Sequence, residues 1–222
     1  MESVPLGVTH LISPFTLLCA APTMSGKSHW IGRLIRRCRS RIYPPIDRVI
    51  YVFSQNQPFF QELAKSCPVP ILFTQDLDNL PVDPSKATFL VIDDYMSLHQ
   101  SDHGMEAKIA EYFIKKAHHQ NVSVAYLVQN LFNSSKVHRT ISLNSQYLWL
   151  GKNPRAIAQI QYLATQMYPG KTYFLREAYK DATLKPYGYL FLDFKQNTPE
   201  KFRVRTDILD GEPIVYVMKS DV

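Results

Sequence analysis

An apolar run that stops at the octapeptide APTMSGKS constrains the fold of this chain more than any other feature of its sequence. Residues 15–20 read FTLLCA, and the octapeptide occupies residues 21–28. Apolar residues then recur at helical spacing at Trp30, Ile31 and Leu34. These three patterns predict a buried strand, a loop and an amphipathic helix, in that order.

The octapeptide fits the phosphate-binding pattern GxxxxGK[ST], except that alanine replaces the first glycine. Backbone N–H groups and the positive end of the following helix attract phosphates, and Gly26 lets the main chain approach them. Lys27 is expected to reach the β- and γ-phosphates and Ser28 to bind Mg²⁺. A glycine-containing turn without function is the alternative, and the flanking strand and helix argue against it. The predicted nucleotide-binding residues are Ala21, Pro22, Thr23, Met24, Ser25, Gly26, Lys27 and Ser28.

A second apolar run ends in two carboxylates. Residues 88–94 read TFLVIDD, about 65 residues after Lys27. We expect Asp93 to lie at the tip of a strand beside the phosphate-loop strand and to hold Mg²⁺ through water or through Ser28. Asp94 is expected to orient and polarise the attacking water. The alternative for Asp94 is a capping role at the start of the next segment.

Three further side chains are candidates for contact with the γ-phosphate. Gln129 follows the apolar run 122–128, and a neighbouring parallel strand would bring its amide toward the loop as a sensor of that phosphate. The alternative for Gln129 is a turn former. Either Arg139 or Arg155 is expected to reach the nucleotide of a neighbouring subunit, a contribution of about 10³ to 10⁵ in rate where such arginines act. The alternative is that both are ordinary surface or structural residues.

Short apolar runs alternate with helix-length segments along the whole chain. This alternation predicts an α/β fold in one domain, a three-layer sandwich in which helices cover both faces of a mainly parallel sheet. Pro154 is expected in the first turn of a helix. The predicted parallel strands are 15–20, 48–53, 69–73, 88–92, 122–128 and 146–150. The predicted helices after the phosphate loop include 57–65, 104–118, 154–167 and 172–182, and terminal strands at 187–193, 202–206 and 213–217 are expected to add an antiparallel edge.

The net charge of +6 is compatible with a polyanionic partner. Five arginines fall within residues 33–41, and they form either a patch that follows DNA phosphates or a solvated helix face. The three cysteines lack the spacing of a zinc site and are expected to be reduced. No apolar run approaches the ~18 to 20 residues that span a bilayer, and no secretion signal is evident, so we expect the chain inside a cell.

The segments APTMSGKS, FLVIDDYM, AYLVQNLF, HRTISLNSQYLWL and KNPR resemble, in order and spacing, the genome-packaging ATPases of double-stranded DNA viruses and virus-like transposons. The sequence is similar to the FtsK/HerA-type packaging proteins of Polinton (Maverick) elements and adintoviruses, and more distantly to the poxvirus packaging ATPase. The similarity extends from about residue 15 to about residue 206. Ala21 departs from the usual glycine, and Asp94 departs from the glutamate usual in the wider class.

The resemblance implies an ATP-driven ring of identical subunits that pumps double-stranded DNA into a preformed capsid. It implies ATP and Mg²⁺ as ligands, and capsid proteins as partners. The expected location is the host cell, with the nucleus favoured over the cytoplasm, or the virion. Two other functions stay open: a nucleoside or nucleotide kinase, and an ATP-binding assembly switch that does not pump. The adjacent acids Asp93 and Asp94 favour hydrolysis over a kinase reaction.

Overall fold

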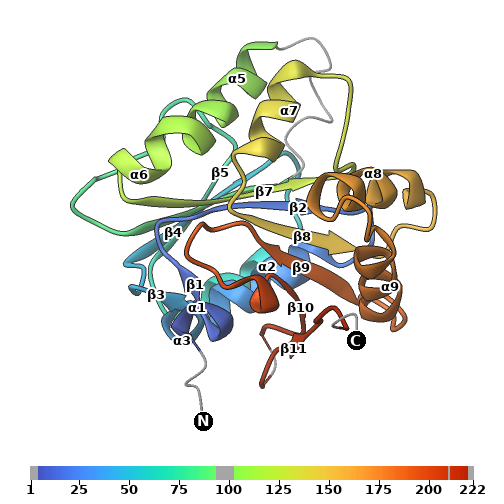
Figure 1. Cartoon of the computed structure of the whole chain (residues 1–222). Helices are drawn as coiled ribbons and strands as arrows, with labels where there is room; N and C mark the ends of the chain where they lie inside the picture. The colour runs from blue at the N-terminus through green and yellow to red at the C-terminus, as the bar shows by residue number, and fades with distance from the viewer. Residues whose placement is uncertain (1–4, 94–102, 210, 220–222) are drawn as a thin grey trace.

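The computed structural model describes residues 5–93, 103–209 and 211–219. Within these residues a nine-stranded sheet has the strand order β11-β10-β9-β8-β2-β7-β6-β4-β5, and two short strands, β1 and β3, pair separately (Figure 1). The strands are β1 (Leu11–Ile12), β2 (Thr16–Ala20), β3 (Ile42–Tyr43), β4 (Arg48–Phe53), β5 (Ile71–Thr74), β6 (Thr88–Asp93), β7 (Val122–Val128), β8 (Tyr147–Gly151), β9 (Tyr189–Asp193), β10 (Val204–Thr206) and β11 (Ile214–Val215).

Helices connect most of the parallel strands. They are α1 (Leu6–Thr9), α2 (Lys27–Arg36), α3 (Cys38–Arg41), α4 (Phe59–Ser66), α5 (His103–Glu111), a π-helical stretch (Tyr112–Lys116) that continues into α6 (Ala117–His119), α7 (Lys136–Leu143), α8 (Ile157–Met167), α9 (Tyr173–Ala182) and a 3₁₀ turn (Glu200–Phe202). No helix in the described residues is both long enough and apolar enough to cross a membrane.

Six neighbouring strands of the sheet run parallel to one another, in the order β5, β4, β6, β7, β2 and β8. By contrast, β9 is antiparallel to β8, and β10 and β11 continue the antiparallel pairing. The predicted parallel sheet with an antiparallel C-terminal edge is therefore confirmed.

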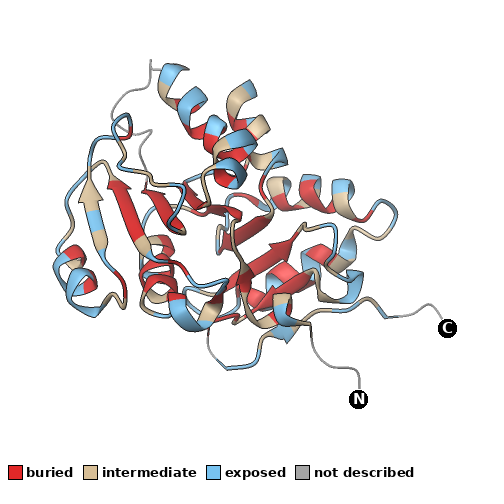
Figure 2. Ribbon diagram, turned by 90° about the vertical axis from the view of Figure 1, so that its left-hand side faces the viewer, coloured by how far each residue is buried: buried red, intermediate tan, exposed pale blue. Residues whose placement is uncertain are grey.

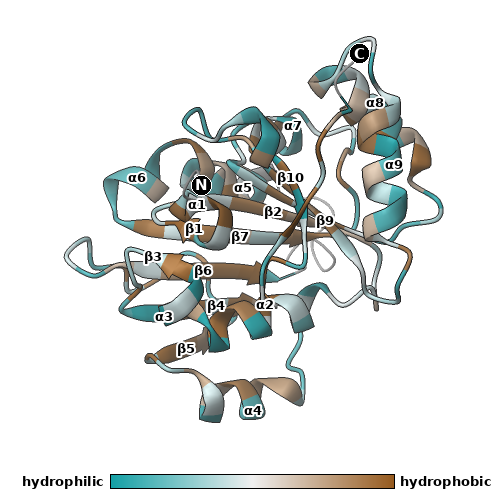
Figure 3. Cartoon of the chain, turned by 60° about the horizontal axis from the view of Figure 1, so that its bottom comes forward, coloured by the Kyte–Doolittle hydropathy of each residue, from teal (hydrophilic) through white to brown (hydrophobic). Residues whose placement is uncertain are grey.

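Two hydrophobic layers cover the sheet, one on each face. Because successive strand residues point to opposite faces, Leu17 and Cys19 pack with α2, α3 and α4, whereas Leu18 and Ala20 pack with α5, α7, α8 and α9. Figure 2 shows the central strands almost wholly buried and the helices buried along one side. In Figure 3 strands β5 and β6 are largely hydrophobic, while α6 and α9 carry hydrophilic segments. The expected three-layer sandwich is the observed architecture.

The order of the central strands corrects one expectation. The sequence predicts Asp93 on a strand next to the phosphate-loop strand, but β7 lies between β6 and β2 and pairs with both. All seven residues of β7 are buried. Such a strand is apolar on both faces, which suits the centre of a helix-covered sheet.

The segment after β8 corrects a second expectation. Pro154 does not lie in the first turn of a helix, because α8 begins at Ile157. Instead, Ala156 N donates to Asn153 O at 3.2 Å, which closes a β-turn with proline at its second position. Proline favours that position because its φ is fixed near the value that the turn requires.

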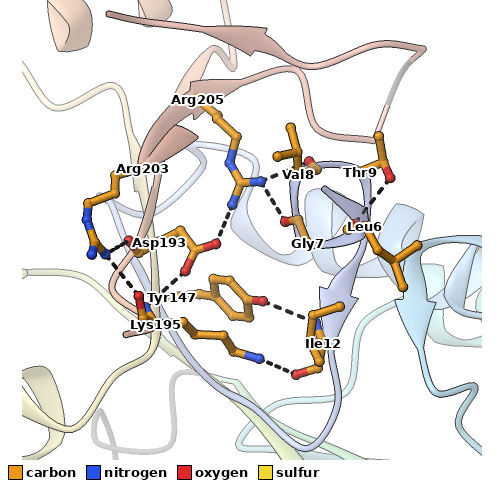
Figure 4. Close-up of polar contacts among 10 residues, drawn as sticks. All are labelled: Leu6, Gly7, Val8, Thr9, Ile12, Tyr147, Asp193, Lys195, Arg203 and Arg205. Atoms are coloured by element: carbon orange, nitrogen blue, oxygen red, sulfur yellow. Dashed lines mark hydrogen bonds and ion pairs between the residues drawn. The ribbon is translucent and has the colours of Figure 1, made fainter. Parts of the chain in front are cut away.

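A buried ion pair fastens the N-terminal segment to the C-terminal strands (Figure 4). Arg205 Nη2 on β10 donates to Asp193 Oδ2 on β9 at 2.8 Å, and both side chains are almost fully buried. Arg205 Nη1 also donates to the carbonyl oxygens of Gly7 at 2.7 Å and Val8 at 2.9 Å. One guanidinium therefore links α1 to the antiparallel edge of the sheet.

Lys195 makes a second link between the same segments. Its Nζ donates to Ile12 O at 2.6 Å and lies over the ring of Tyr147 (Figure 4). The hydroxyl of Tyr147 in turn accepts from Ile12 N at 3.1 Å. Burial lowers the pKa of Lys195 to about 8, and the nearby Asp193 carboxylate partly opposes that decrease.

Candidate active site

The phosphate loop connects the end of β2 to the start of α2, as the sequence predicts. Ala21 N donates to Val128 O at 3.2 Å, which extends the sheet by one residue before the chain turns. Met24 and Gly26 then adopt positive φ values of 62° and 91°. Trp30 N donates to Gly26 O at 2.9 Å and begins the helix. The N–H groups of the first helical turn have no partner inside the helix and carry its positive end.

Glycine is favoured at position 26 for two reasons. Its φ of 91° is unfavourable for residues with a side chain. A Cβ at this position would also lie 3.1 Å from Cδ1 of Tyr187, closer than ordinary van der Waals contact. Gly26 therefore brings the main chain and the Tyr187 ring together at the head of α2.

The structure also accounts for alanine in place of the first glycine of the motif. Ala21 is buried and belongs to the hydrophobic layer that contains α2. A Cβ added to Gly151 on the adjacent strand would lie only 2.9 Å from Cβ of Ala21. The methyl group of Ala21 therefore lies against a glycine in the core, and the phosphate loop keeps its path.

Lys27 is the buried cation of the loop. Its Nζ donates to the carbonyl oxygens of Ala21 at 2.6 Å and Pro22 at 2.9 Å. Ser25 Oγ is also buried, and it makes no hydrogen bond within the part of the chain that the structure describes. The loop thus combines a positive charge, a helix N-terminus and an unused hydroxyl, which together suit an anion.

Asp93 brings a buried carboxylate to the same place. Ser28 Oγ donates to Asp93 Oδ2 at 2.9 Å, and Tyr51 Oη donates to the same oxygen at 2.6 Å. Burial raises the pKa of Tyr51, and the negative charge of Asp93 raises it further. The phenol therefore stays protonated and keeps donating to the carboxylate at neutral pH.

The hydroxyl of Ser28 and the carboxylate of Asp93 offer oxygen ligands, which Mg²⁺ prefers. The described residues contain no cluster of three or more histidine, cysteine, aspartate or glutamate side chains arranged for a metal. Magnesium commonly binds with one or two protein carboxylates, substrate phosphates and water. The residues present fit that type of site.

A cavity of about 790 Å³ opens over the loop. That volume lies within the range of about 300–1,000 Å³ typical of ligand sites. Its lining includes most of the phosphate loop, residues of the first two turns of α2, two glutamines after β4, and one tyrosine before β9. These residues are Thr23, Met24, Ser25, Gly26, Lys27, Ser28, His29, Trp30, Arg33, Gln55, Gln57, Asp93 and Tyr187.

Gln129 lies at the same edge of the sheet. It directly follows β7, whose last residues pair with Ala20 of β2 and with Asp93 of β6. The side chain of Gln129 is exposed, and it lines a small space beside Ala20 and Ala21. The structure therefore brings Gln129 to the edge that carries the loop and Asp93. Its role as a sensor remains a prediction.

Of the other predicted site residues, two lie away from the cavity and one is outside the described residues. Asp94 is outside the described residues. Arg139 is exposed on α7, and Arg155 is exposed in the turn before α8. Neither arginine lines the cavity of its own chain.

The arginine cluster after the loop is largely tied to the chain itself. Arg36 pairs with Glu62 at 3.5 Å and donates to Ser66 Oγ at 2.9 Å. Arg37 donates to the carbonyl of Leu209, and Arg41 donates to the carbonyls of Thr9 and Gly211. These contacts favour a structural role over DNA contact for three of the five arginines.

The sequence interpretation missed two tyrosines of this site. Tyr51 lies within an apolar strand. A tyrosine in such a strand is expected to be buried, and a buried tyrosine hydroxyl usually has a hydrogen-bond partner, which was the available signal. Tyr187 lies between Pro186 and Gly188, in a turn that the sequence pattern assigns to the start of a strand. A proline and a glycine around one residue are the signal for a turn.

Neither family models nor curated protein sequences match this chain. The structure is similar to that of the genome-packaging NTPase B204 from Sulfolobus turreted icosahedral virus 2 in complex with ATPγS, with a TM-score of 0.53 and 14% identity over 87% of this chain and 96% of that chain. It is also similar to B204, the DNA-packaging ATPase from Sulfolobus turreted icosahedral virus, with a TM-score of 0.52 and 13% identity over 87% and 97%. At these identities the likeness is one of fold, and the chain has the P-loop fold of these viral genome-packaging NTPases.

Proposed function

We propose that the chain hydrolyses ATP to drive double-stranded DNA into a viral or transposon capsid. The observation that carries the proposal is the hydrogen bond between Ser28 and Asp93 at the cavity where Lys27 lies. It joins the phosphate loop to a carboxylate 65 residues away in the sequence. The fold shared with packaging NTPases supports the same conclusion.

In this proposal the loop binds the triphosphate through its backbone N–H groups and Lys27. The ammonium of Lys27 would give up a hydrogen bond to a carbonyl oxygen of the loop and donate to phosphate oxygens in its place. Ser28 and Asp93 would hold Mg²⁺, which neutralises charge on the β- and γ-phosphates when bound. Tyr51 keeps the Asp93 carboxylate oriented by donating to one of its oxygens.

Hydrolysis then requires a water molecule to attack the γ-phosphorus as the bond to the β–γ bridging oxygen breaks. The bridging oxygen leaves with ADP, and the water gives up a proton. We assign the orientation of that water to Asp94 and the detection of the γ-phosphate to Gln129. The position of Gln129 directly after β7, between the strands of the loop and of Asp93, supports its assignment.

An arginine from a neighbouring subunit would neutralise charge that develops in the transition state. Arg139 and Arg155 are both exposed and lie outside the cavity lining of their own chain. That placement supports a role toward a second copy in a ring. We place the chain with the packaging ATPases of Polinton elements, adintoviruses and, more distantly, poxviruses, acting in the host nucleus or on the virion with capsid proteins as partners.

A groove that carries three basic side chains, here called the basic groove, supports DNA as the substrate that the motor moves. The groove lies between α8 and α9 and has a volume of about 370 Å³. Apolar residues such as Ile157, Ile160 and Leu184 form part of its lining, and its charged residues are Lys152, Arg176, Lys180 and Glu177. All four of these residues are exposed. Lysine and arginine side chains bind DNA phosphates regardless of base sequence, as a translocating motor requires.

The test is ATP hydrolysis by the purified chain with and without double-stranded DNA at low salt, alongside its mass in solution. The proposal expects release of inorganic phosphate that rises when DNA is added, in a multimeric species. Hydrolysis that is indifferent to DNA contradicts the motor. Phosphate transfer to a nucleoside or nucleotide in place of water supports a kinase, and ATP binding without turnover supports an assembly switch.

A further inference from the structure

We propose that Tyr187 is the surface on which the base of the bound nucleotide stacks. This proposal rests on the proposed function, because it requires a triphosphate in the phosphate loop. Tyr187 lines the same cavity as Gly26, Lys27 and Asp93. The residue is 69% exposed, so the aromatic ring is accessible at that cavity. Base stacking on such a face is favourable for any base, because every base has a π-face.

The position of Tyr187 relative to the loop fits the base end of a nucleotide. Tyr187 directly precedes Gly188 and β9, and β9 lies two strands from β2 on the side of β8. Asp93 ends β6, two strands from β2 on the opposite side. A triphosphate whose metal-bound end lies toward Asp93 would therefore have its base end toward Tyr187. Arg33, on the second turn of α2, lines the cavity as well.

Tyr187 has a backbone conformation that is uncommon for a residue with a side chain. Gly188 N donates to Lys185 O at 3.1 Å, which closes a β-turn over Lys185, Pro186, Tyr187 and Gly188. Tyr187 is the third residue of this turn and has a φ of 61°. After a proline at the second position, a positive φ at the third is typical of a type II turn, which favours glycine there. A tyrosine in this conformation is strained, and strained residues cluster at functional sites.

The neighbouring glycine fixes the turn in place. A Cβ on Gly188 would lie 2.4 Å from the carbonyl oxygen of Ala182 and 3.2 Å from Cα of Thr183. The turn is therefore in tight contact with the C-terminal end of α9. That contact positions the turn that carries Tyr187, whose ring lies beside Gly26.

The test compares a nucleotide with its base-free equivalent. Binding of the non-hydrolysable ATP analogue AMP-PNP and of inorganic tripolyphosphate, each with Mg²⁺, is measured by calorimetry. Tyr187→Gly removes the ring and supplies the residue that the turn favours, so this variant is expected to keep the thermal midpoint of the wild-type chain. Tyr187→Phe keeps an aromatic face. Tyr173→Ala removes a tyrosine that is 54% exposed and lies outside the cavity lining.

The proposal predicts that Tyr187→Gly weakens AMP-PNP binding at least about tenfold, within the range of base–aromatic stacking. GMP-PNP is expected to lose affinity by a similar factor, because stacking discriminates little between bases. Tripolyphosphate binding is expected to be unchanged, and Tyr187→Phe and Tyr173→Ala are expected to bind AMP-PNP like the wild-type chain.

Two results would overturn the proposal while leaving the triphosphate site intact. The first is unchanged AMP-PNP binding by Tyr187→Gly. The second is an equal loss of AMP-PNP and tripolyphosphate, which would mean that the ring only supports the loop. A wild-type chain that binds neither probe contradicts the proposed function itself, and the stacking proposal with it.

Discussion

Ser28 Oγ donates to Asp93 Oδ2 at 2.9 Å, so the first turn of α2 and the last residue of β6 meet at one buried carboxylate. The hydroxyl of Tyr51 donates to the same oxygen. Two strands and one helix thereby converge on the place where the phosphate loop opens to the cavity. Asp93, Ser28 and Tyr51 come from three different elements, so single substitutions can test the role of each side chain.

Asp93→Asn is expected to fold normally and to lose catalysis. The amide oxygen can still accept from Ser28 and Tyr51, but the charge that holds a divalent cation is gone. Because the metal contributes several kcal/mol to the transition state, we expect kcat to fall on the order of 100-fold. Steady-state hydrolysis over a range of Mg²⁺ concentrations measures this.

Tyr51→Phe is the matched control for Asp93. It keeps the carboxylate and removes one hydrogen-bond donor, so we expect kcat to fall by about tenfold, the lower end of the range for residues that orient a metal ligand. Asp93→Asn with the wild-type rate at saturating Mg²⁺ would exclude Asp93 as a metal ligand.

Asp193→Ala is expected to destabilise the chain by about 3–5 kcal/mol, because it leaves Arg205 buried without its counter-charge. Denaturant unfolding measures the loss. Replacing both partners, with Asp193→Leu and Arg205→Met, is expected to cost less than the single change. Asp78→Ala removes an ion pair to Lys108 whose side chains are each about half exposed, and it should cost no more than about 1 kcal/mol. Equal costs for Asp78→Ala and Asp193→Ala would contradict the role given to the buried pair.

Lys195 is expected to make stability depend on pH. Its pKa is about 8 in the folded chain against an ordinary value of 10.5, because burial disfavours the charged form. Between these values the unfolded chain binds more protons, so the free energy of unfolding rises with pH. The penalty of the buried charge is thus fully present below about pH 8 and is relieved as the pH approaches 10.5.

Denaturant unfolding of the wild-type chain and of Lys195→Met at several pH values checks this dependence. The stability of the wild-type chain relative to Lys195→Met should increase from pH 8 to pH 10. The same comparison with Lys65→Met, a change at an exposed position on α4, should show no such trend. A difference that stays constant over this range would show that Lys195 keeps its ordinary pKa, and a difference that falls would show that folding raises its pKa. Either result contradicts the prediction.

The basic groove between α8 and α9 is expected to bind DNA phosphates. Changing Lys152, Arg176 and Lys180 to glutamine should weaken DNA binding and DNA-stimulated hydrolysis while basal hydrolysis persists. The slope of log affinity against log salt should decrease by about one for each side chain that no longer neutralises a phosphate. Glutamine at the exposed lysines Lys65, Lys86 and Lys115 provides a control of equal charge. Identical salt slopes for the two triple variants would place the DNA elsewhere.

Short sequence patterns predicted those parts of the site that are formed by residues adjacent in the sequence. The strand, loop and helix around Lys27 followed from contiguous residues, and the carboxylate at the end of β6 followed from its apolar run. The order of the strands did not follow. Which strands are neighbours depends on how helices pack across the sheet, and β7 separates β6 from β2 although each strand was located correctly.

Helix α7 and the position of Tyr187 are among the features that the sequence patterns do not predict, for physical reasons that the structure makes clear. Helix α7 is short and contains β-branched residues, so its propensity is weak. Its stability comes from the cap of Ser135, whose side chain accepts from His138 N, and from burial of His138 and Ile141. Tyr187 was missed because its role depends on a turn that packs against α9 and Gly26, and Gly26 is distant in the sequence.

Binding of Mg²⁺ and AMP-PNP by the wild-type chain and by Lys27→Ala tests the central claim most directly. With Lys65→Ala as the control for an exposed lysine, we expect saturable, Mg²⁺-dependent binding by the wild-type and control chains, and a loss of at least about 100-fold in Lys27→Ala, since a charged hydrogen-bonding group is removed from the phosphates. Equal affinities in a folded Lys27→Ala and in the wild-type chain would contradict the assignment of residues 21–28 as the triphosphate site.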